Sequence, residues 1–288
     1  IRDRARENQW GFVDFNRPMV AINQWEQAED SMYTLCGKDR IHPSTDGHLV
    51  MAYLFLKAQG LAGKPVADIR IDGAGKKVTR SDNCRVSDLS VSSDNLTFTY
   101  EAKSLPYPID TSYYDNEKHT QADALSVIPF MDEMNYEGLS VSGLSDGYYG
   151  LTIGGEFIGR FTARELERGI NMALLQNTPQ YKQAMKIRQM NEERWLKERK
   201  MREFYWVEYN LMRKTGMLWA CNEAAVDTLR KYRPHDIFLQ WNGALWLQYM
   251  HKGIREDCVN EQQDLVNQIY EQNKPIPLQI EIKKFTDL

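Results

Sequence analysis

The chain has 288 residues, 42% of them apolar, and a formal net charge of -4. This composition is typical of an ordinary globular protein with enough apolar residues for a core, and its length could hold two domains. The small negative charge excludes a basic face of the kind that recruits nucleic acid or acidic lipid. No apolar run approaches the ~18 residues of a membrane span. We therefore expect neither a nucleic-acid partner nor a membrane span.

The first region, residues 1–63, is predicted to alternate helix, strand and helix. Residues 1–9 are typical of the end of a charged helix, and the apolar run at 11–15 predicts a short strand. Residues 18–35 are predicted to be helical. One strand is too few to close a parallel sheet and would present an unpaired edge. We therefore expect a missing N-terminal segment or another chain to complete the sheet.

A further helix is predicted after the loop at 39–43. Ser44 or Thr45 can supply its N-cap. Residues 49–56 are apolar nearly all round, so we expect this helix to be buried on more than one side. The region as a whole is typical of one end of an α/β sandwich, in which helices cover a mainly parallel sheet.

The second region, residues 64–161, changes to a period of two. Apolar and polar residues alternate in five short segments, at 67–72, 96–102, 139–143, 149–153 and 157–161. Turn pairs such as Asp72-Gly73 and Gly154-Gly155 separate them. This pattern predicts antiparallel strands that form a small β-sandwich.

The third region, residues 162–288, returns to helical periodicity. Thr162 and Glu165 have the spacing of a capping box, and Thr178 followed by Pro179 predicts the start of a long helix. That helix is predicted to run to about residue 214. Two further helices are expected at 218–232 and 235–272, and the alternating segment at 278–282 predicts a terminal strand.

The cysteines do not indicate a metal or redox site. They are widely spaced and include no CxxC pair, being Cys36, Cys84, Cys221 and Cys258. Buried free thiols are the expectation, because cysteine is often simply buried. The sequence does not decide whether two of these cysteines form a disulfide.

Asp39 and His42 form the chemical motif of the chain, in the loop Asp39-Arg40-Ile41-His42-Pro43. Acyl transfer by serine needs an imidazole to take the hydroxyl proton and a carboxylate to fix the tautomer of that imidazole. A spacing of three residues lets the carboxylate reach the ring from the same loop. Asp39 and His42 are therefore the candidate catalytic residues. The alternative is a structural loop with a surface histidine.

This loop and its surroundings resemble a known family. Asp-x-x-His-Pro, followed by Gly47-His48 and the apolar helix, resembles the last segment of the SGNH (GDSL-type) serine ester hydrolases, over residues 10–62. Residues 64–288 resemble the C-terminal extension of a bacterial subset of that family. The resemblance implies that His42 is the general base and Asp39 its orienter.

The family's nucleophilic serine, and its Gly and Asn oxyanion donors, have no counterparts in this chain. We therefore expect an α/β fold class, as a partial SGNH three-layer sandwich over 1–63, with a small antiparallel β-sandwich over 64–161 and a helical region over 162–288. This chain alone is expected to be inactive.

The resemblance implies a serine ester hydrolase that deacylates carbohydrate, with acetyl as the expected acyl group. The expected partner is an acylated carbohydrate or another small ester. No metal or other cofactor is needed for serine acylation and hydrolysis. Family members of this type imply a periplasmic or secreted location. Two alternatives stay open: a lipid-directed esterase of the same chemistry, and a non-catalytic carbohydrate-binding or scaffolding fragment.

One motif competes with this interpretation. Residues 143–147 match Gly-x-Ser-x-Gly, which would make Ser145 a nucleophile. A nucleophile elbow needs a strand before it and a helix after it. Here a strand pattern follows, so we predict a hairpin turn instead.

The remaining histidines and aromatic residues have weaker implications. His119, His235 and His251 have no partner at metal-ligand spacing and are expected to be solvated or core histidines. The aromatic residues of 195–249 could stack on sugar rings, but packing between helices is the favoured interpretation. Tyr107, Tyr113 and Tyr114 are the better candidates for an exposed aromatic rim.

Overall fold

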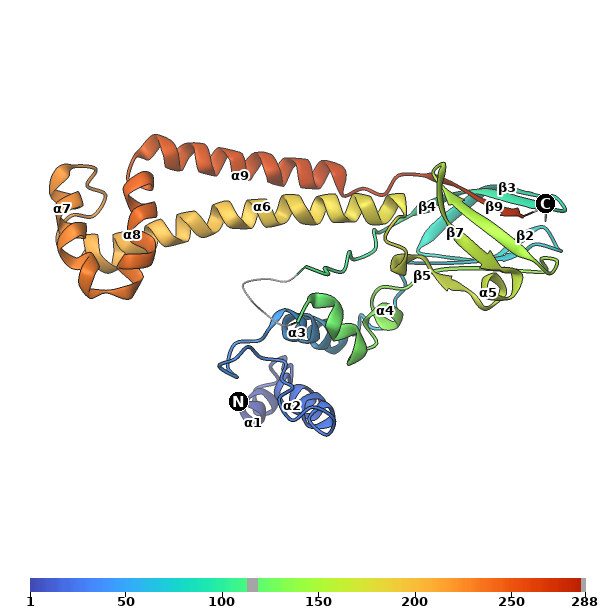
Figure 1. Ribbon diagram of the computed structural model, residues 1–288, viewed down its shortest axis with the longest axis horizontal. Coiled ribbons are helices and arrows are strands. Elements are labelled where there is room, and N and C mark those ends of the chain that lie inside the picture. Colours follow the sequence, from blue (N-terminus) through green and yellow to red (C-terminus); the bar gives the residue numbers. More distant parts are fainter. Residues whose placement is uncertain (113–118, 286–288) are drawn as a thin grey trace. The chain divides into compact units, whose positions relative to one another are not determined.

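The computed structural model describes residues 1–112 and 119–285 (Figure 1). The chain has a mixed α/β fold with two β-sheets and a helical region toward its C-terminus. It divides into two compact units. The first comprises residues 1–184 and 275–288, and the second comprises residues 185–274. The predicted boundaries near 63 and 161 both fall inside the first unit and stay predictions.

The smaller sheet has four strands in the order β2-β1-β5-β8. Its strands are β1 (Ala67–Asp72), β2 (Lys77–Asp82), β5 (Glu137–Ser142) and β8 (Ile170–Asn171). Strand β1 pairs antiparallel with β2 but parallel with β5, with Ala67 opposite Glu137. The expectation of antiparallel strands alone was therefore wrong at this pair. The reason is topological: a long excursion separates β1 from β5, and a parallel pair requires such a crossover.

The larger sheet is antiparallel throughout and has the order β3-β4-β9-β6-β7. Its strands are β3 (Cys84–Val91), β4 (Asn95–Ala102), β6 (Tyr148–Ile153), β7 (Glu156–Thr162) and β9 (Leu278–Lys284). The terminal strand predicted from the alternating tail is confirmed as β9. It lies in the centre of the sheet between β4 and β6, so both edges of its backbone are paired, and its alternating apolar residues are buried.

The two sheets share one apolar core, which confirms the predicted sandwich. Fully buried side chains come from both sheets, among them Ile69, Ile71, Leu139 and Val141 from the smaller sheet and Leu96, Phe98, Leu151, Ile153, Ile280 and Ile282 from the larger one. The strands that supply these residues contribute every second one, as the period of two requires.

Residues 1–63 contain three helices and no extended strand. The helices are α1 (Arg2–Glu7), α2 (Asn16–Glu26) and α3 (Thr45–Ala58). The strand predicted at 11–15 is not formed, and Phe12 is 40% exposed. A strand needs a neighbour for its backbone N–H and C=O groups, and no strand of the described residues pairs with this segment. Helix α2 is also shorter than predicted and buries no residue.

Helix α3 packs against a later segment of the chain instead of a sheet. Leu49, Val50 and Tyr53 form a second core with buried residues of 109–130. That segment holds the short helices η1 (Gln121–Ser126) and α4 (Phe130–Glu133). Only one side of α3 is buried, because Phe55 on the other side is 43% exposed. The expectation that α3 is buried on several sides was therefore wrong.

The capping predictions for the helices after β7 are confirmed. Thr162 and Glu165 form the expected capping box at α5 (Ala163–Arg168). Helix α6 (Pro179–Val207) begins at the predicted proline and continues as a π-helical turn, Glu208–Met212. A short 3-10 turn, η2 (Met172–Leu174), lies between α5 and α6.

The second unit is entirely helical. It holds most of α6 together with α7 (Glu223–Tyr232), η4 (Arg233–His235), α8 (Ile237–Tyr249) and α9 (Lys252–Gln272). The helix predicted at 235–272 is thus two helices, separated at Met250 and His251. In Figure 1, α9 lies beside α6, and the ion pair between Lys197 and Glu261 at 2.6 Å joins them. Within the described residues, none of the helices has both the length and the apolar character that crossing a bilayer requires.

A carboxylate is buried at the end of the sandwich core. Glu137 is fully buried, and its Oε1 accepts hydrogen bonds from the Tyr100 hydroxyl at 2.8 Å and from Gln180 Nε2 at 3.2 Å. Among the described residues, its Oε2 has no hydrogen-bond partner. Burial therefore outweighs the two hydrogen bonds and raises the pKa of Glu137 to about 7.

We expect Glu137→Gln to remove a pH dependence from the stability of the first unit. Between about pH 4.5 and 7 the folded state keeps a proton that the unfolded state has lost, so the wild-type protein loses stability as the pH rises through this window. The full cost above pH 7 is about 3 kcal/mol. Thermal unfolding of the wild-type protein and of Glu137→Gln from pH 4.5 to 8 measures this loss of stability. Parallel curves for the two proteins would show that Glu137 is not titrating in this range.

Candidate active site

The loop that carries Asp39 and His42 is closed at its base by backbone contacts. Cys36 and Pro43 form an isolated bridge, and the Gly37 N–H donates to the His42 carbonyl at 2.8 Å. At the tip, Arg40 has a φ of 58°, in the left-handed region that costs a non-glycine residue about 1 kcal/mol. This turn brings the side chain of Asp39 close to that of His42.

The carboxylate of Asp39 contacts both the ring and the backbone of His42. Its Oδ2 lies 2.5 Å from His42 Nδ1, while Oδ1 accepts the N–H groups of Ile41 at 2.9 Å and His42 at 3.1 Å. The hydrogen bond with the His42 ring, followed by the two backbone hydrogen bonds, lowers the pKa of Asp39 to about 2. The side-chain contact expected from the three-residue spacing is thus present. The catalytic role of the two residues stays a prediction.

The second ring nitrogen of His42 faces solvent. The side chain is 84% exposed, and among the described residues no hydroxyl group is hydrogen-bonded to the ring. Ser44, two residues on, is buried, and its hydroxyl donates to the Leu35 carbonyl at 3.0 Å and to Asp46. Ser44 is therefore engaged in holding the loop and is not placed to attack an ester.

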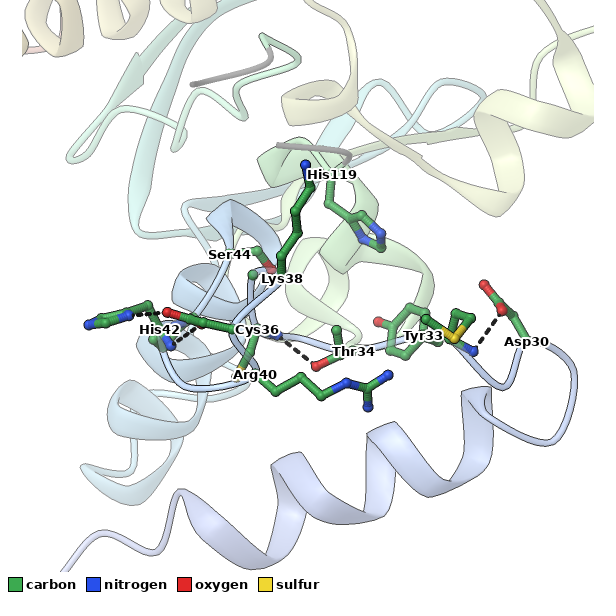
Figure 2. Close-up of a pocket in the computed structure, with 13 residues that line it drawn as sticks. Asp30, Tyr33, Thr34, Cys36, Lys38, Arg40, His42, Ser44 and His119 are labelled. Carbon is green, nitrogen blue, oxygen red and sulfur yellow. Dashed lines mark hydrogen bonds and ion pairs between the residues drawn. The ribbon is translucent and has the colours of Figure 1, made fainter. Parts of the chain in front are cut away.

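A pocket of about 720 Å³ opens beside this loop. Figure 2 shows the side chains that line it. Six of them are acidic, basic or histidine side chains, namely Asp30, Lys38, Asp39, Arg40, His42 and His119. Tyr33, Thr34, Cys36 and Ser44 add further polar groups. The volume lies in the range of sites for small ligands.

A second Asp–His pair lines the same pocket, and sequence reasoning missed it. His119 Nδ1 lies 2.8 Å from Asp46 Oδ2, although the two residues are 73 positions apart. Asp46 is 1% exposed and His119 has 30% of its side chain exposed. His119 is thus partly buried and paired with a carboxylate, and the expectation of a solvated or core histidine stays a prediction. No spacing rule could have found the pair, because it forms only when α3 packs against the segment that follows residue 118.

The Gly-x-Ser-x-Gly segment has no elbow geometry. It connects β5 to β6, so a strand follows Ser145 as predicted, although the strands belong to different sheets and the turn is not a hairpin. The Ser145 hydroxyl accepts from Lys284 Nζ at 2.8 Å and lies 3.1 Å from the Tyr149 hydroxyl. These contacts are consistent with a turn fastened to β9.

The aromatic residues of the helical unit divide between core and surface. Phe204 and Trp246 are fully buried, as expected from packing between helices. Trp219 and Trp241, by contrast, are 47% and 66% exposed. Tyr107 is 41% exposed, whereas Tyr113 and Tyr114 lie outside the described residues.

The four cysteines differ in their exposure. All four cysteines are free, but only Cys84 and Cys258 are buried, so the expectation of buried thiols was right for two of them. Exposed Cys221 has its Sγ 3.4 Å from His251 Nδ1. In the part of the chain that the structure describes, no three His, Cys, Asp or Glu side chains are grouped so that they could hold a metal ion.

Comparison with known proteins gives two similarities. Residues 185–274 match the family model of the diltiazem deacetylase C-terminal helical domain, and these bounds coincide with the second compact unit. The solved structure of a gut microbial diltiazem-metabolizing enzyme is 42% identical in sequence, with a TM-score of 0.92. A search of the curated proteins found no match.

That match covers 99% of this chain and 64% of the length of the solved structure. The chain is thus similar, over nearly all its length, to part of a larger enzyme chain. Both similarities are to proteins that are described by their action on diltiazem. Neither of them names the SGNH class or a carbohydrate substrate.

We expect the Asp39 carboxylate to titrate near pH 2. In His42→Ala the same carboxylate should titrate closer to its ordinary value, because the hydrogen bond that lowers the pKa most is removed. Carboxyl ¹³C NMR of selectively labelled protein measures both midpoints. An unshifted Asp39 in the wild-type protein would mean that the contact with His42 is not formed in solution.

Proposed function

We propose that the natural protein is a serine ester hydrolase of SGNH type that removes acetyl groups from a polar alcohol, with acetylated carbohydrate as the substrate class. The observation that carries this proposal is the contact between Asp39 and Nδ1 of His42 beside an open pocket. The similarity to a diltiazem-metabolizing enzyme and to a diltiazem deacetylase domain supports ester hydrolysis.

In this proposal His42 is the general base. Asp39 accepts a hydrogen bond from the Nδ1–H group, so Nε2 carries the lone pair that takes the proton of a serine hydroxyl as its oxygen attacks the ester carbonyl. The imidazolium that forms is stabilised by the ionised Asp39. It returns the proton to the leaving alcohol, and water then hydrolyses the acyl-serine by the same steps in reverse.

The nucleophile is proposed to come from outside the 288 residues. Three observations support this. None of the described hydroxyl groups is bonded to the exposed face of His42. The matched enzyme chain is longer than this one. Large apolar side chains of residues 1–63 are also uncovered, with Trp10 at 65%, Trp25 at 79% and Ile41 at 74% exposure. A further protein segment over these residues would bury them and bring a serine to His42.

The lining of the pocket favours a polar substrate over a lipid. Most of the side chains are charged or hydrogen-bonding groups, and the apolar ones are few, such as Met32 and Pro43. Hydroxyl groups of a substrate find hydrogen-bond donors and acceptors among these side chains. A sugar that carries an acetyl ester fits this lining better than a fatty ester.

We expect His42→Ala to lower kcat for ester hydrolysis by about 10⁴-fold or more in the full-length natural protein, since no other group replaces the base. Asp39→Asn should also lower kcat, because the tautomer is no longer fixed. Nitrophenyl acetate and a mono-acetylated glucose are suitable substrates. Ser145→Ala is the matched control and should neither lower activity nor reduce labelling by a fluorophosphonate probe.

Three outcomes would count against the proposal. Hydrolysis at the wild-type rate by His42→Ala would remove His42 from the mechanism. Labelling of Ser145 by the probe would identify a different nucleophile. Binding of acetylated sugar by the full-length protein without any hydrolysis would instead favour the carbohydrate-binding alternative.

A further inference from the structure

The pocket beside His42 contains a second histidine whose orientation is fixed by a buried carboxylate. Asp46 accepts hydrogen bonds from the Ser44 hydroxyl and from the Gly47 N–H at 2.8 Å, and its Oδ2 faces His119 Nδ1 at 2.8 Å. With 1% of its side chain exposed, Asp46 is held on all sides. A carboxylate in such a position accepts from Nδ1–H and so fixes the tautomer of the ring.

The ring of His119 is also fixed from its side. Tyr33 packs against it edge-on, with ring centroids 5.8 Å apart and an interplanar angle of 62°. Among the described residues Nε2 of His119 has no hydrogen-bond partner, and the ring lines the pocket. When Nδ1 carries the only ring proton, Nε2 is an acceptor toward a ligand. A hydroxyl group is the natural donor for it.

The two histidines occupy different parts of the pocket. In the view of Figure 2, the Lys38 side chain lies between His42 and His119. The pocket volume of about 720 Å³ is far larger than an acetyl group needs, so most of it is open to the alcohol part of the ester. A group bound at His119 is therefore remote from the bond that is cleaved at His42.

We propose that His119, oriented by Asp46, is a substrate-binding residue that accepts a hydrogen bond from a free hydroxyl on the alcohol part of the ester. This inference rests on the proposed function. It narrows the substrate class to esters of polyhydroxylated alcohols. His119 takes no part in the acyl transfer; it holds the substrate so that the ester carbonyl lies at the catalytic dyad.

The test compares two esters in the full-length natural protein. Mono-acetylated glucose carries free hydroxyl groups, and nitrophenyl acetate carries none. For His119→Ala we expect KM to rise about 10-fold for the acetylated glucose with kcat within about twofold, and neither constant to change for nitrophenyl acetate. A tenfold change is what one lost hydrogen bond of about 1.4 kcal/mol gives.

Two variants complete the design. Asp46→Asn should raise KM for the acetylated glucose in the same way, and the double variant should be no worse than His119→Ala, because Asp46 acts through His119. His48→Ala is the matched control: this histidine is exposed on α3, two residues from Asp46, and does not line the pocket. If Asp46→Asn fails to fold, the comparison of His119→Ala with His48→Ala alone tests the role of His119.

The outcomes separate this inference from the proposed function. Hydrolysis of both esters with an unchanged KM in His119→Ala would overturn the role of His119 and leave the esterase function standing. Hydrolysis of nitrophenyl acetate alone would overturn the substrate class. If neither ester is hydrolysed, the proposed function fails. Saturation-transfer NMR with acetylated glucose then decides binding at His119, and a signal equal in wild type and His119→Ala would overturn the inference as well.

Discussion

The candidate site depends on a close approach between the backbone of Leu35 and the first turn of helix α3. A Cβ atom at Gly47 would collide with the Leu35 carbonyl, so only glycine allows the two segments to touch. The same carbonyl accepts the N–H and the hydroxyl of Ser44, each at 3.0 Å. Leu35 itself is fully buried against α3. The two ends of the loop that carries Asp39 and His42 are thus held together at Leu35 and the start of α3.

The two Asp–His pairs of the pocket are built on different physical principles. Asp39 and His42 meet within one turn and remain exposed. Asp46 and His119 meet only through the packing of α3 on the segment 109–130, with the carboxylate withdrawn from water. Exposure leaves the ring of His42 open to another group, whereas burial of Asp46 holds its partner in one orientation.

The β-sandwich and the helical unit each contain a buried carboxylate, and the two are stabilised in different ways. In the helical unit, Glu208 accepts the Trp246 ring N–H and the Trp219 backbone N–H, both at 2.8 Å, one on each oxygen. In the sandwich, Glu137 leaves one oxygen without a partner among the described residues, and its pKa rises accordingly. Polar groups that are buried need full hydrogen bonding, and where it is incomplete the proton is retained instead.

The sequence by itself determined the features whose causes are local. The capping box at Thr162, the proline start of α6, the alternating strands and the contact between Asp39 and His42 all follow from residues a few positions apart. The apolar run at 11–15 marked a segment fit for a strand, but a strand exists only when another strand satisfies its backbone, and no local pattern can state that.

Only the tertiary structure decided which distant segments meet. It placed β9 in the middle of the larger sheet, paired β1 with β5 in parallel, and interrupted the last predicted helix at Met250 and His251. It also joined Asp46 to His119 across 73 positions. These contacts arise from burying apolar surface over the whole chain, and that free energy depends on which faces are brought together, not on the spacing of residues along the sequence.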